Sequence, residues 1–168
     1  FAFFLVEIFL IIFYPQNLSG SWMTFHKDGL ILNKNRGKSL HQHGNKKVIY
    51  HFGKYHNRKY PNLILKKKDN ILILGDSFTF GWLISDEETF IYKLNNHYNK
   101  LNFINVSTGG WGTSDQLRYL ENFCKLVNPK KTIIFFNSAD IDRSFISNLN
   151  KINEKNILEK NNVKINNF

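Results

Sequence analysis

At 168 residues the chain is long enough for one domain with a substantial core, because a chain of ~150 residues buries roughly two-thirds of its unfolded surface. A hydrophobic content of 42%, with 16 Phe, 7 Tyr and 3 Trp, excludes a disordered chain. The formal net charge of +10 comes mostly from lysines in Asn-rich stretches rather than from arginines, the usual readers of phosphates and bases, so we expect no nucleic-acid binding.

Residues 1–14 are apolar except for Glu7 and end before Pro15. A helix over this segment would be about 21 Å long at ~1.5 Å per residue, shorter than the roughly 30 Å hydrocarbon core of a bilayer. Because the chain begins with Phe rather than Met, we expect a truncated membrane anchor or signal segment, with a buried core helix as the alternative. An anchor would hold the protein at the inner membrane, facing the periplasm or the cell exterior.

Residues 15–62 are rich in Gly, Asn, His and Lys, with only short extended pieces such as LILN and VIYHFG. This composition predicts an irregular arm that contains no more than one hairpin. His41 and His43 have no Cys, Asp or Glu at ligand spacing, so we expect a solvated loop there and no metal site.

Residues 63–150 alternate between strand and helix patterns. The runs DNILILG, LNFINVS and KTIIFFN predict three strands, each a short apolar segment followed by turn residues. Capping boxes at Ser85 and Glu88, and at Thr113 and Gln116, predict the starts of two helices between them. This order indicates an α/β fold with a parallel sheet and helices on its faces. Residues 151–168 follow as a predicted polar tail.

Each predicted strand ends in residues suited to a functional site: GDS, STGGWG and NSAD. The carboxyl ends of parallel strands meet at one edge of a sheet, where ligands bind in such folds. Ser77 lies at a strand-to-helix turn, which would expose its hydroxyl beside the N–H groups of a helix end. The competing interpretation is that Ser77 is an ordinary helix N-cap.

The string LGDSFTFG resembles the first sequence block of the SGNH hydrolases, also called GDSL esterases, in their membrane-anchored bacterial form. NVSTGGWGTSDQ resembles the second block, and the resemblance covers roughly residues 48 to 145. It implies a three-layer α/β/α sandwich of the flavodoxin-like type. It also implies that Ser77 is the nucleophile, that the N–H groups of Ser77 and Gly110 belong to an oxyanion hole, and that Asp76 structures the turn.

The chain departs from this family pattern in two places. Ala139 stands where the family has an oxyanion Asn, and Asn137, two residues earlier, could replace it only if the loop bends back. The family's catalytic His belongs to an Asp-x-x-His block near the C-terminus, and no His follows His97. We expect a fragment of a longer protein with its base beyond Phe168; the rival is a natural short form without activity.

The resemblance implies a serine esterase that acts at the cell envelope on acyl esters, for instance those of an acetylated polysaccharide, without a cofactor. Two other classes stay open. One is an inactive carbohydrate-binding or O-acetyltransferase-related module on the same fold, which Ala139 favours. The other is a membrane-tethered basic interaction domain, which the net charge favours.

Overall fold

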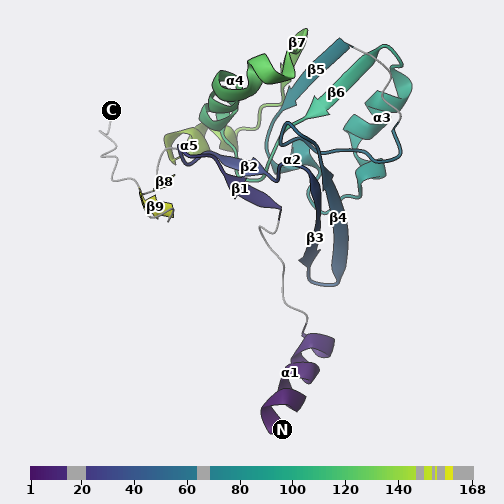
Figure 1. Cartoon of the computed structure of the whole chain (residues 1–168), viewed down its shortest axis with the longest axis vertical. Coiled ribbons are helices and arrows are strands. Elements are labelled where there is room, and N and C mark those ends of the chain that lie inside the picture. Colours follow the sequence, from purple (N-terminus) through teal and green to yellow (C-terminus); the bar gives the residue numbers. More distant parts are fainter. Residues whose placement is uncertain (15–21, 64–68, 147–149, 153, 155–157, 161–168) are drawn as a thin grey trace.

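The computed structural model describes residues 1–14, 22–63, 69–146, 150–152, 154 and 158–160 (Figure 1). Its helices are α1 (Ala2–Phe13), α2 (Ser77–Phe80), α3 (Phe90–His97), α4 (Thr113–Val127) and α5 (Ala139–Ile146), with a 3-10 turn η1 (Asp86–Glu88). Its strands are β1 (Met23–Phe25), β2 (Ile31–Asn33), β3 (Gly37–His43), β4 (Lys46–Phe52), β5 (Asp69–Leu74), β6 (Leu101–Asn105), β7 (Lys131–Ile134), β8 (Asn150–Ile152) and β9 (Leu158–Lys160).

The centre of the molecule is a three-stranded parallel sheet in the order β6-β5-β7, which confirms the predicted α/β class. Successive residues of β5 face opposite sides of the sheet. Leu72 and Leu74 pack in a core cluster with residues of α4, whereas Ile71 and Ile73 pack with Ile91 of α3. The two helices therefore cover opposite faces of the sheet, as Figure 1 shows.

The strand β7 is less covered than its sequence suggests. The run IIFF at residues 133–136, which begins in β7, is apolar on both faces, a pattern typical of a buried parallel strand. Among the described residues, however, β7 pairs only with β5, and Ile133 and Ile134 are 41% and 47% exposed. The exposed apolar surface continues through Phe135 and Phe136 toward the third strand-end loop.

The segment before the sheet is more regular than predicted, because it contains two antiparallel pairs, β1–β2 and β3–β4, instead of at most one hairpin. In β3–β4, a turn at Gly44 and Asn45 joins His43 to its partner Lys46. One face of this hairpin is buried in a cluster of Trp22, Val48, Tyr50 and Phe52 against Phe80 of α2. The hairpin therefore supports the helix that begins at Ser77.

The predicted caps are partly confirmed. The capping box of Ser85 and Glu88 is present and begins η1, while Thr89 caps α3 by accepting the Tyr92 N–H. At α4 the cap lies one residue earlier than predicted, where the Asp115 carboxylate accepts the Gly112 N–H at 3.0 Å.

The two ends of the chain are described only in part. All side chains of α1 are exposed, and no helix among the described residues is both long and apolar enough to cross a membrane. In the predicted polar tail, β8 and β9 form a short antiparallel pair, and residues 153, 155–157 and 161–168 lie outside the described part.

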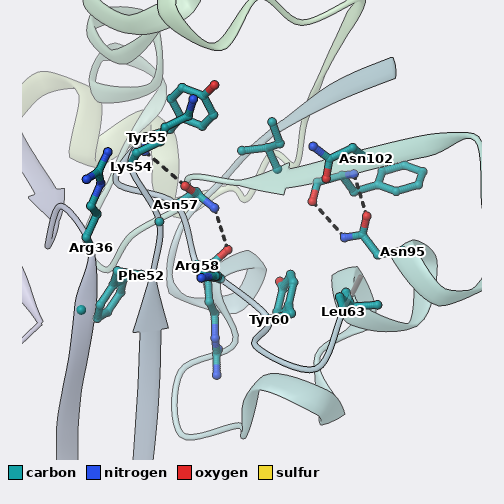
Figure 2. Close-up of a pocket in the computed structure, with 15 residues that line it drawn as sticks. Arg36, Phe52, Lys54, Tyr55, Asn57, Arg58, Tyr60, Leu63, Asn95 and Asn102 are labelled. Carbon is teal, nitrogen blue, oxygen red and sulfur yellow. Dashed lines mark hydrogen bonds between the residues drawn. The ribbon is translucent and has the colours of Figure 1, made fainter. Parts of the chain in front are cut away.

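The outer edge of β6 is closed by a side chain rather than by another strand. Asn95 of α3 is 2% exposed; its amide donates to the Phe103 carbonyl and accepts the Phe103 N–H, both at 2.9 Å (Figure 2). Further along the edge, the Arg58 N–H donates to the Asn105 carbonyl. The carboxamide of Asn95 thus makes the hydrogen bonds that a neighbouring strand would make, which protects the edge from pairing with another chain.

We expect Asn95→Ala to lower the free energy of unfolding by about 2–3 kcal/mol, because it leaves a buried N–H and a buried carbonyl without partners. Urea denaturation of the purified chain measures this change. The Asn95 amide also donates to the carbonyl of Ile91, four residues earlier. Asn122→Ala is the matched control, since the Asn122 amide makes the same kind of hydrogen bond to Arg118 on an exposed face of α4. Equal losses in the two variants would contradict the role of Asn95 at the edge.

Candidate functional site

Ser77 lies at the carboxyl end of the central strand. After β5, Gly75 and Asp76 form a tight turn, and Asp76 caps α2 by accepting the Phe78 N–H at 2.9 Å. A Cβ on Gly75 would collide with the side chain of Thr79, so the turn requires glycine. The turn leaves Ser77 half-buried as the first residue of α2.

The hydroxyl and the N–H of Ser77 form no hydrogen bond within the described part of the chain. The same holds for the N–H of Gly110, which is exposed and has a φ of +82°, a conformation that favours glycine. The predicted nucleophile and both predicted backbone donors therefore form no hydrogen bond with the described residues.

Arg143 of α5 joins the three strand-end loops. Its Nη1 atom lies 2.8 Å from Asp76 Oδ2, 3.4 Å from Asp140 Oδ1 and 3.5 Å from the carbonyl oxygen of Trp111. These contacts connect the residue before Ser77 and the residue after Gly110 to α5, the helix that follows the loop after β7. The structure thus brings together the three loops that the sequence placed at one sheet edge, while Arg143 itself was not predicted.

The close approach of α5 to the second loop depends on another glycine. A Cβ on Gly112 would lie 2.8 Å from both Arg143 Cβ and Ser144 N, and 2.9 Å from the Asp140 carbonyl oxygen. These distances are shorter than any normal contact of a Cβ atom. Gly112 therefore permits the packing that brings Arg143 to Asp76.

Asp140 and Asn137 organise the third loop. Asp140 is fully buried, and its Oδ2 accepts the Asn137 N–H at 3.0 Å and a longer hydrogen bond of 3.5 Å from Gln116 Nε2. The Asn137 Oδ1 atom accepts the Ala139 N–H at 3.1 Å, so this side chain caps the start of α5. The Asn137 Nδ2 group donates to none of the described residues and stays available as the third donor of the predicted oxyanion hole.

A buried carboxyl group lies at the start of α4. Burial raises the pKa of Asp115 to about 6, although its hydrogen bond from the Gly112 N–H and the nearby Arg118 act in the opposite direction. Asp115 fixes the turn that carries Gly110 to Gly112 at the helix start.

No histidine of the described part hydrogen-bonds to Ser77. His97 is exposed at the end of α3. The expectation of a solvated loop at His41 and His43 is wrong, because both residues lie in β3 and His41 is buried, where its Nε2 accepts the Trp82 indole N–H at 2.8 Å. His51 forms a hydrogen bond of 2.6 Å with Asp86, on the β4 side of the hairpin. The described residues also contain no cluster of three or more potential metal ligands.

Two cavities among the described residues lie away from Ser77. One of about 550 Å³ lies beside β6, where Arg36, Lys54, Tyr55, Asn57 and Asn102 contribute to its wall (Figure 2). A second of about 550 Å³ lies between β4 and η1 and includes His51 and Asp86. Neither has Ser77 or Gly110 in its lining.

No protein-family model matches this chain, and no curated protein is significantly similar to it.

Proposed function

We propose that this chain carries the nucleophile and oxyanion-hole part of a serine esterase of the SGNH type, on the flavodoxin-like sandwich that the family uses. The observation that supports the proposal most is the Arg143 contact set, which draws the loops of Ser77, Gly110 and Asn137 to one place. The string LGDSFTFG around Ser77 supplies the reaction class.

In the proposed reaction, Ser77 Oγ attacks the carbonyl carbon of an ester. The carbonyl oxygen becomes an oxyanion, which the N–H groups of Ser77 and Gly110 and the Nδ2 of Asn137 stabilise. The bond to the alcohol breaks, the alcohol leaves with the proton, and water then releases the acid from the serine. A base must take the Oγ proton at a distance of about 3 Å, and the described residues supply none.

We further propose that the protein acts at the cell envelope, held to the inner membrane by the apolar segment 1–14 and facing the periplasm or the cell exterior. The sequence FAFFLVEIFLIIF and the complete exposure of α1 support this location. An acyl ester is the substrate class, and acetylated polysaccharide is one example of it.

A fluorophosphonate probe tests the proposal on the protein expressed from its complete reading frame. We expect covalent labelling, because such probes react only with an activated serine. Ser77→Ala should abolish labelling, whereas Ser138→Ala, which removes an exposed serine of the third loop, should retain it. Labelling that survives Ser77→Ala would refute the assignment of the nucleophile.

The second candidate function is an inactive carbohydrate-binding or O-acetyltransferase-related module, because Ala139 replaces the amide of the family's oxyanion Asn. Losing one such donor costs about a hundredfold or more in rate. Absence of labelling, together with glycan binding that Ser77→Ala does not change, would support this candidate.

A further inference from the structure

The outer face of the β3–β4 hairpin combines apolar and basic side chains in rows. In the antiparallel register Lys38 lies opposite His51, Leu40 opposite Ile49, and Lys47 opposite Gln42, which is itself buried. Opposite residues project to the same face of a sheet, so these pairs share one surface. The other face of the hairpin is buried in the core around Tyr50.

This face departs from the usual pattern of a solvated sheet surface, which is polar. Leu40 and Ile49 form its central row and are 42% and 48% exposed. Lys38 lies on one side of that row and Lys47 on the other, both exposed. Lys59 extends the Lys38 row, because its N–H donates to the His51 carbonyl at 2.8 Å.

Two cavities open beside this face. The one beside η1 has Lys46, Lys47 and Ile49 in its wall together with the acidic residues of η1, whereas a smaller one of about 340 Å³ has Lys38 and Lys59 and no acidic residue. The acidic side chains of η1 are engaged with neighbouring groups. There Asp86 bonds Arg58 and His51, Glu87 accepts from Asn62, and Glu88 accepts from Ser85.

We propose that the outer face of β3–β4 binds the surface of an anionic lipid bilayer. The lysines would contact headgroup phosphates while Leu40 and Ile49 enter the interfacial region between them. The apolar row favours a bilayer over a soluble polyanion, because a solvated polymer offers charge but no apolar layer. This inference is independent of the proposed esterase reaction.

The experiment compares binding of the full chain to two kinds of vesicle, one of phosphatidylcholine alone and one of phosphatidylcholine mixed with phosphatidylglycerol. Since the exposed α1 helix can bind either, the measured quantity is the ratio of the two partition coefficients at physiological salt. We expect the double variant Lys38→Glu/Lys59→Glu to lower this ratio by about tenfold or more, since each lysine near an anionic surface contributes several-fold.

Lys93→Glu/Lys125→Glu is the matched control, with the same change in net charge on the exposed surfaces of α3 and α4. An equal fall in the control would overturn the proposal, because only net charge would then matter. Leu40→Ser/Ile49→Ser should weaken binding to anionic vesicles several-fold and leave binding to dextran sulfate unchanged. No effect of this pair on vesicle binding would overturn the lipid assignment in favour of a soluble polyanion.

Discussion

Replacing Arg58 with methionine is expected to lower the free energy of unfolding by about 3–5 kcal/mol, the cost of breaking a buried ion pair by removing one partner. Arg58 is 1% exposed, and its Nε donates to Asp86 Oδ1 at 2.9 Å. Its Nη1 donates to the carbonyls of Phe80 and Gly81, both at 2.8 Å, and its Nη2 donates to that of Ile84. Methionine fills part of the space but supplies none of these donors.

The loss should be visible in urea denaturation, with Lys130→Met as control, because the Lys130–Asp69 pair is exposed and such pairs contribute only about 0–1 kcal/mol. A second variant separates the cost of leaving the Asp86 carboxylate unpaired from the cost of losing the Arg58 side chain itself. Removing both charges in Arg58→Met/Asp86→Asn should recover part of the stability, since no uncompensated carboxylate then remains beside the cavity of the missing guanidinium. A double variant as unstable as the sum of its single changes would show that the two residues act independently.

Arg58 also bears on the proposed nucleophile. The carbonyls of Phe80 and Gly81 lie at the C-terminal end of α2, and the guanidinium stacks 5.0 Å from the Phe80 ring. Since α2 is only four residues long, its direction is set by contacts at its two ends. Arg58 fixes one end and Asp76 caps the other, so Ser77 is held between two charged anchors.

The sheet could be predicted from the sequence because its signals are local. The apolar runs, the caps and the asparagine that ends α4 all lie within a few residues of the elements they define. The hairpins also had local signals that the composition of residues 15–62 obscured. Asp28 and Gly29, and Gly44 and Asn45, are turn pairs at the tips of β1–β2 and β3–β4, with both glycines at positive φ.

The contacts that assemble the site could not be predicted in this way. Asn95 and Phe103 are close in sequence, but their pairing depends on how α3 packs against the edge of β6. Arg143 and Asp76 are 67 positions apart, and Arg58 and Asp86 are 28 positions apart. A single arginine in a lysine-rich chain is a weak local signal, yet two of the few arginines hold the loops around Ser77. The pair of Asp140 and Arg143 does have a local signal in the sequence, since an acidic and a basic residue three apart lie on one helix face.

Replacing Arg143 with methionine is expected to slow fluorophosphonate labelling of Ser77 by about tenfold or more, an effect comparable to losing a positioned catalytic contact. Without the guanidinium, the carboxylates of Asp76 and Asp140 lose the cation between them. Asp76 is 2% exposed and Asp140 is fully buried, so their repulsion should separate the first and third loops. Because Arg143 is 27% exposed, water can enter its place and solvate the two carboxylates in part. We therefore expect the free energy of unfolding to fall by only about 1–3 kcal/mol.

Two comparisons decide whether Arg143 positions the nucleophile or only stabilises the fold. Arg143→Lys keeps the charge but carries it on a shorter side chain that ends in a compact ammonium, which does not reproduce the position of Nη1, so its labelling rate should lie between those of the wild type and Arg143→Met. Arg36→Met, which removes an exposed arginine outside the site, should leave the rate unchanged. Rates are compared at a temperature where urea denaturation shows every variant to be folded. If Arg143→Met then loses stability while its folded form labels at the wild-type rate, the arginine holds α5 in place without setting the geometry of Ser77.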